Sequence, residues 1–148
     1  MKSDIRLMLA AFAAASFLMV SPSTFARDLN VDLNCRSTPH SFIASLENDR
    51  SIEPAPMRVE SNSVNAFRPT HSGNLTAFGF KIYAVVGYEQ GDTIFKKGSG
   101  QAIDGSMYGA VVSGSVETVE AQIRKDGSSA IAKQVVPLLL TAIVCKAP

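Results

Sequence analysis

Two cysteines near opposite ends of the chain constrain its fold more than any other feature of the sequence. Cys35 stands in the stretch NVDLNCRSTPHSF, and Cys145 stands almost at the C-terminal end. A disulfide between them would close a loop of about 110 residues, which the chain-entropy model credits with roughly 4 to 5 kcal/mol of stabilisation. The alternatives are that Cys35 is a nucleophile or a metal ligand. The compartment of the protein decides between these interpretations.

The N-terminal residues indicate export. Lys2 and Arg6 form a short basic region, residues 7–20 form an apolar run, and small residues lead up to Ala26. This pattern is typical of a secretory signal peptide, and we expect cleavage after Ala26. A membrane anchor is the alternative, but the run is shorter than the roughly 20 residues that span a bilayer. The sequence therefore predicts a removed signal peptide over residues 1–26 and a periplasmic or secreted protein.

The remaining residues, 27–148, fit a single globular domain of 122 residues. Removal of Lys2, Arg6 and Asp4 with the signal peptide leaves 12 basic and 12 acidic residues, so the formal charge falls from +1 to zero. A neutral domain has no electrostatic footprint for nucleic acid or an anionic membrane. We expect no nucleic-acid partner and no stable membrane insertion after cleavage.

In an oxidising compartment, two cysteines of a small domain are expected to pair, so we predict a Cys35–Cys145 disulfide. A catalytic cysteine would need a histidine oriented by a third group, and the sequence shows no such arrangement. Zinc would need three or four ligands, and the two cysteines with His40 and His71 lack the short spacings of zinc sites. The sequence predicts no metal and no cofactor.

Periodicity and capping residues predict the secondary structure. Thr38 and Pro39 begin an expected helix over residues 39–48, and Ser113 or Ser115 caps a second expected helix over residues 115–126. One bent strand or two short strands are expected within residues 56–67, and further strands over residues 108–112 and 130–146, the last covered on both faces. The strongest strand pattern lies in LTAFGFKIYAVVGY, where one face would carry the apolar residues Phe78, Phe80, Ile82, Ala84, Val86 and Tyr88. A tight turn at Gly91 and Asp92 would return residues 93–97 as the antiparallel partner.

This order of elements predicts an α+β domain of two layers, with a largely antiparallel sheet, two helices packed on one of its faces, and one disulfide joining the N- and C-terminal parts. The alternative is an all-β sandwich, which would require residues 115–126 to form a strand despite their helical period.

The segment KKGSGQAIDGSMYG is the candidate interaction surface. Its spacing matches no phosphate-binding loop, and GSMYG does not match the nucleophile elbow, so we expect a flexible loop between strands. The residues assigned to this surface are Lys96, Lys97, Gly98, Ser99, Gly100 and Tyr108.

Three classes of function remain. The first is a non-catalytic protein-interaction module in the bacterial envelope or outside the cell, of the inhibitor, immunity or assembly type, with an unknown protein partner. The second is a carrier of a small apolar ligand, with the Phe78, Phe80 and Ile82 face lining a cavity between sheet and helices. The third is a small hydrolase that uses His40 or His71 with a nearby carboxylate. We predict the first class, without catalytic residues.

Overall fold

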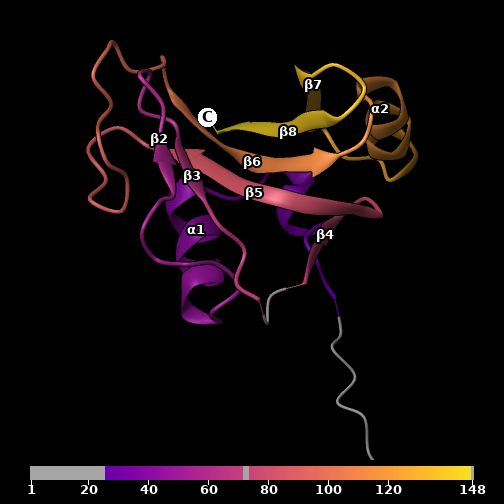
Figure 1. The fold of residues 1–148 in the computed structure, drawn as a ribbon, viewed down its shortest axis with the longest axis horizontal. Helices are drawn as coiled ribbons and strands as arrows, with labels where there is room; N and C mark the ends of the chain where they lie inside the picture. Colours follow the sequence, from indigo (N-terminus) through magenta and orange to yellow (C-terminus); the bar gives the residue numbers. More distant parts are fainter. Residues whose placement is uncertain (1–25, 72–73, 148) are drawn as a thin grey trace, which may run out of the picture.

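The computed structural model describes residues 26–71 and 74–147 of the chain (Figure 1). The predicted signal peptide therefore lies, apart from Ala26, outside the described residues. The elements in chain order are β1 (Arg27–Asp28), the 3-10 helix η1 (Asp32–Asn34), α1 (Pro39–Asn48), β2 (Arg58–Val59), β3 (Asn65–Phe67), β4 (Leu75–Ala77), β5 (Phe80–Tyr88), β6 (Ser106–Ser113), α2 (Val116–Lys125), β7 (Ile131–Val136) and β8 (Leu140–Ala147).

Helix α1 begins at the predicted residue, and α2 begins after Ser115, one of its two predicted caps. The Thr38 hydroxyl accepts a hydrogen bond from the Ser41 N–H at 3.1 Å, and Pro39 occupies the first turn of α1. The Ser115 hydroxyl caps α2 in the same way. Such caps satisfy backbone donors that the first turn of a helix leaves without partners. The helical prediction for residues 115–126 is confirmed, which rules out the all-β sandwich.

In the described part of the chain, eight strands form one mixed and mostly antiparallel sheet. The order across it is β1, β4, β5, β6, β8, β7, while β3 pairs with β5 beyond β4 and carries β2 on its outer side. Strands β1 and β4 run parallel, and the remaining pairs are antiparallel. The α+β prediction is confirmed.

One face of the sheet carries the core. Tyr108 of β6 and Cys145 of β8 are cross-strand partners, so their side chains share a face. The Phe42 ring of α1 lies 4.8 Å from the Tyr108 ring, and the buried residues Val119 and Ile123 of α2 belong to the same apolar cluster. Both helices therefore pack on one face, with α1 beside β3 and β5 and α2 at the other end of the sheet (Figure 1).

The predicted strand over residues 75–88 is a hairpin with a bulge, which corrects the assignment of its faces. Phe78 and Gly79 have φ values of 51° and 84° and form the turn between β4 and β5. Within β5, the register to β6 shifts between Ile82 and Ala84. A bulge moves the following side chains to the opposite face, so Val85 continues the core face that Ile82 begins.

The predicted return strand over residues 93–97 is wrong. These residues form no strand, and β5 pairs instead with β6 after the long connection 89–105. The physical reason is a competing partner: the Lys96 N–H and C=O bond to the side-chain amide of Asn65. A backbone so engaged is not available for a ladder.

The predicted single strand over residues 130–146 is also wrong. It is the hairpin of β7 and β8, with Pro137 in the turn and a bulge between Gln134 and Val136. Proline lacks the N–H that a ladder requires, and Leu138 adopts a φ of 62° to reverse the chain. Strand β7 is consequently an edge strand and is not covered on both faces.

Candidate interaction surfaces

The glycine-rich candidate loop is held against the β2–β3 turn. Asn65 is fully buried, its side-chain oxygen accepts the Lys96 N–H at 2.9 Å, and its side-chain nitrogen donates to the Lys96 carbonyl at 2.8 Å. The Gly98 N–H donates to the Ser63 hydroxyl, and the Gly100 N–H donates to the Ser61 carbonyl, both at 2.9 Å. The loop expected to be flexible is thus tied at three points.

Gly98 is required by this attachment. A Cβ atom at Gly98 would lie 2.1 Å from the Glu60 carbonyl oxygen, far inside van der Waals contact. The Gly98 and Gly100 N–H groups, which could have bound a phosphate, already have partners. The loop therefore offers a partner mainly the exposed side chains of Lys96, Lys97 and Ser99, together with the exposed Gly100.

Tyr108 does not belong to the candidate surface. Its side chain is fully buried under α1, and its hydroxyl oxygen accepts the Ser37 N–H at 3.1 Å. Burial raises the pKa of the Tyr108 phenol; the Ser37 hydrogen bond opposes this shift, and the charge of Asp32 adds to it. Sequence reasoning placed Tyr108 on the loop because it treated β6 as beginning at Tyr108, whereas β6 begins at Ser106.

Cys35 and Cys145 form the predicted disulfide, which joins the end of η1 to β8. In the described residues no cysteine is free, so this part of the chain offers no thiol nucleophile. Among the same residues, no group of three or more His, Cys, Asp or Glu side chains is placed to hold a metal ion. The disulfide is consistent with an oxidising, extracytoplasmic location.

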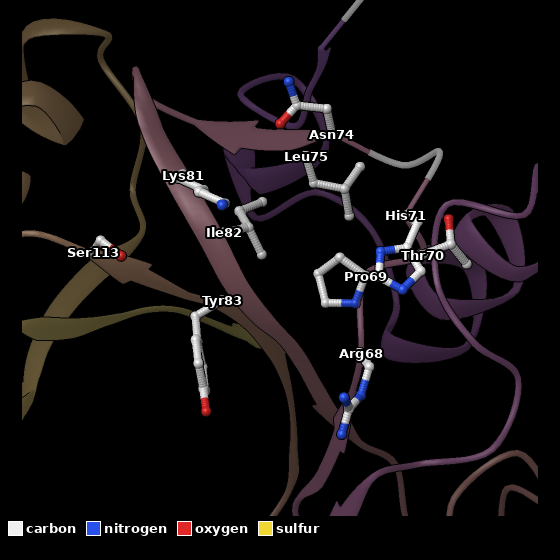
Figure 2. Close-up of a pocket in the computed structure, with 10 residues that line it drawn as sticks. All are labelled: Arg68, Pro69, Thr70, His71, Asn74, Leu75, Lys81, Ile82, Tyr83 and Ser113. Atoms are coloured by element: carbon white, nitrogen blue, oxygen red, sulfur yellow. The ribbon is translucent and has the colours of Figure 1, made fainter. Parts of the chain in front are cut away.

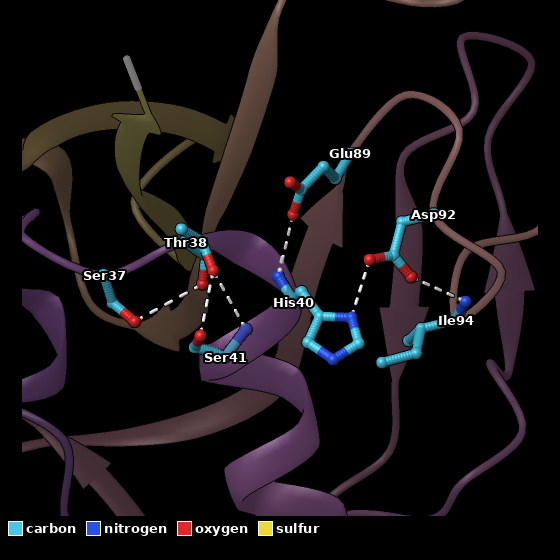
Figure 3. Close-up of polar contacts among 7 residues, drawn as sticks. All are labelled: Ser37, Thr38, His40, Ser41, Glu89, Asp92 and Ile94. Carbon is cyan, nitrogen blue, oxygen red and sulfur yellow. Dashed lines mark hydrogen bonds and ion pairs between the residues drawn. The ribbon is translucent and has the colours of Figure 1, made fainter.

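His40 does meet a carboxylate, as the hydrolase alternative required. Its Nδ1 lies 2.6 Å from Asp92 Oδ2, and its backbone N–H donates to Glu89 at 3.1 Å (Figure 3). The other Asp92 oxygen accepts the Ile94 N–H at 2.9 Å, which orients the carboxylate. No described residue forms a hydrogen bond with the His40 Nε2. These bonds tie the start of α1 to the 89–105 connection. Asp92 could orient the His40 imidazole for catalysis, but in the described residues no hydroxyl group is hydrogen-bonded to that ring.

The face proposed for an apolar carrier is packed core. Phe78 and Ile82 are 5% and 3% exposed and belong to the central apolar cluster, against which the partly buried Phe80 packs. Ile82 also borders a surface cavity that includes His71, but that cavity lies between β5 and the 68–71 segment and not between sheet and helices (Figure 2).

Five of the eight large apolar side chains that are exposed in the described residues lie on the β7–β8 hairpin, which sequence reasoning treated as buried. Leu138 and Leu139 in the turn are 80% and 64% exposed, and Val135 beside them is 51% exposed. Ile131 and Val136 of β7 are exposed as well. We call residues 131–139 the hairpin surface. The proline within VVPLLL was the signal that could have revealed it, because proline marks a turn more readily than the centre of a covered strand.

Strand β7 also leaves one backbone edge of the sheet open along its whole length. It pairs with β8 on one side, and no described residue pairs with its other side. The strands at the opposite border, β1 and β2, contain two residues each, whereas β7 contains six. Short edge strands protect a sheet against further pairing; β7 has only Lys133 and its bulge for this purpose.

No protein-family model matches the chain, no curated protein is significantly similar to it, and no solved structure matches its fold. Within residues 26–71 and 74–147, no helix combines the length and apolar character needed to cross a bilayer.

Proposed function

We propose that the protein is an exported, non-catalytic interaction module that binds an extended segment of a partner protein along the hairpin surface. The observation that carries this proposal is the coincidence of an open six-residue edge with exposed apolar side chains at its end. The open edge offers backbone donors and acceptors to an added strand, and apolar side chains beside it add contact area. Contiguous exposed apolar groups are a feature of binding sites more than of ordinary surface.

The charge of the edge favours a foreign segment over a second copy of this chain. Lys133 is the one charged residue of β7 and stands near its centre. Two β7 strands paired antiparallel with the twofold axis at Lys133 would place the two Lys133 side chains directly opposite each other, where like charges repel. A partner segment with an acidic residue among apolar residues would place opposite charges there. This is the chemistry we assign to the partner.

Photo-crosslinking in the exporting cell tests the proposal. A photoreactive residue at Leu138 is expected to capture a specific protein, whereas the same residue at Glu117, on the exposed side of α2, is expected to capture none. The captured protein is then purified, and its affinity is measured for the wild type and for the Leu138→Asp/Leu139→Asp double variant. We expect the double variant to bind at least tenfold more weakly.

Val31 provides a matched control, because it is 79% exposed and borders a surface pocket with residues 126–128, outside the hairpin surface. Val31→Asp introduces the same chemical change as Leu138→Asp and should leave binding intact. If the double variant binds the captured protein as tightly as the wild type does, the hairpin surface is not the binding site. A wild-type dimer in sedimentation that the double variant dissociates would show that the occupant is a second copy, contrary to the proposal.

A further inference from the structure

A cavity of about 510 Å³ opens where the sheet loses its pairing beside β5 (Figure 2). The ladder from β3 ends with Phe67 opposite Val85, and the ladder from β4 begins with Thr76 opposite Lys81. No described residue pairs with residues 82–84 on this side. The gap has the size of an ordinary small-molecule site, which is roughly 300 to 1,000 Å³.

The gap exists because the chain turns away from β5 to pair elsewhere. The Arg68 carbonyl accepts the Glu53 N–H at 2.9 Å, and the Thr70 N–H donates to the Ser51 carbonyl at 3.0 Å. Pro69 forms an isolated bridge with Ile52 between these bonds. One wall of the cavity is therefore fixed by backbone hydrogen bonds, and the opposite wall is β5 itself, so the space is formed before any ligand arrives.

The cavity is lined by three basic side chains and by no carboxylate. Arg68 and His71 stand on one wall and Lys81 on the other, and Figure 2 shows Lys81 and His71 extending toward the space between them. In the described residues, no carboxylate lies within ion-pair distance of these three side chains. By contrast, Arg27, Arg58 and Arg124 each have an acidic partner. Arg68 and Lys81, which border the same cavity without a counter-charge, give it a positive potential that attracts anions.

The rest of the lining suits the body of an organic ligand. Tyr83 is 61% exposed at the cavity border, so the face of its ring is available to a planar or apolar group. Leu75 and Ile82 supply apolar contact at the floor, and Ser113 adds a hydroxyl. A few polar groups that fix orientation within an apolar lining are typical of small-molecule sites.

We propose that this cavity is a binding site for the phosphate or carboxylate group of a small organic anion. Arg68 and Lys81 hold the oxyanion from two sides, because a guanidinium can donate two parallel hydrogen bonds and an ammonium adds a mobile charge. Tyr83 contacts the body of the ligand. The site shares no residue with the hairpin surface, and this proposal does not depend on the proposed partner.

The test is an NMR titration of the disulfide-bonded, ¹⁵N-labelled protein with phenyl phosphate at low ionic strength, where exposed charges are least screened. We expect saturable shifts of the amides around Arg68 and Lys81. The Arg68→Gln/Lys81→Gln variant is expected to bind at least tenfold more weakly, whereas the matched variant Lys96→Gln/Lys97→Gln, which removes two exposed cations elsewhere, binds as the wild type does. Tyr83→Ala should weaken phenyl phosphate and leave inorganic phosphate unchanged.

Several outcomes would overturn the proposal. Shifts that stay linear and are spread over all cationic surfaces would show unspecific ion attraction, and so would equal losses in the two double variants. If the cavity variant unfolds, the single variants Arg68→Gln and Lys81→Gln must each weaken binding, or the site is wrong. Vesicles distinguish the source of the anion: binding to phosphatidylglycerol vesicles that free phenyl phosphate cannot displace would assign the cations to a lipid surface and refute a small-molecule site.

Discussion

Replacing both cysteines by alanine should destabilise the protein by an amount set by the loop that the disulfide closes. The sequence separation of Cys35 and Cys145 is 110 residues. The chain-entropy model gives about 16 cal/mol/K for such a loop, or about 5 kcal/mol at 25 °C. A domain of about 120 residues unfolds with an entropy of about 0.25 kcal/mol/K, so the melting temperature should fall by about 20 °C.

Calorimetry of three samples separates the effect of losing the crosslink on the melting temperature from the effect of losing the sulfur atoms. The oxidised wild type, the reduced wild type and the Cys35→Ala/Cys145→Ala variant are compared at one pH. Cys145 is fully buried, so alanine there also loses some packing, whereas the reduced wild type keeps both sulfur atoms. We expect both crosslink-free samples to lose most of the 20 °C. A fall below about 5 °C in the reduced wild type would refute the entropic reasoning.

The anchored loop and the buried phenol give two further predictions. Asn65→Ala removes the two hydrogen bonds to Lys96 and leaves the Lys96 N–H without its partner. The free energy of unfolding, measured with urea, should therefore fall by about 2 to 3 kcal/mol. A fall below about 0.5 kcal/mol would mean that other contacts hold the loop. Because the pKa of Tyr108 is raised in the folded state, the unfolded phenol releases its proton first, near pH 10, and stability should fall from there until the pH passes the folded pKa. Tyr108→Phe should remove the part of the alkaline loss of stability that comes from this phenol. At pH 7 the variant should be less stable by about 1 kcal/mol, because the Ser37 N–H loses its acceptor. If stability falls with alkaline pH as it does in the wild type, Tyr108 is not the group responsible.

The features that local chemistry determines could be predicted from the sequence. Thr38 followed by Pro39, and Ser115 before an amphipathic segment, fix helix starts through bonds within one turn of chain. The disulfide followed from the number of cysteines and the expected oxidising compartment. In each case the deciding interaction is either local in sequence or has one available partner.

The strand boundaries could not be predicted because distant residues decide them. Residues 93–97 have a plausible strand pattern, but Asn65, about 30 residues earlier, holds the Lys96 backbone. The bulge at Tyr83 is visible only in the register with β6. Period-two alternation therefore identified β5 but misassigned its second half, since one extra residue exchanges the two faces.

The hairpin surface shows why hydrophobicity alone did not predict that residues 131–139 are mostly exposed. The run VVPLLL and the core strands have similar composition, and a sequence pattern cannot tell whether a strand will lie at the centre of a sheet or at its edge. That position depends on α2, which carries the chain from β6 across β8 and leaves β7 outermost. Scattered exposed apolar residues need no explanation, but Leu138 and Leu139 adjoin an unpaired edge, where exposure also risks aggregation. A partner that buried Leu138 and Leu139 in a complex would remove that risk. This is the physical reason to look for the partner at the hairpin before the glycine-rich loop.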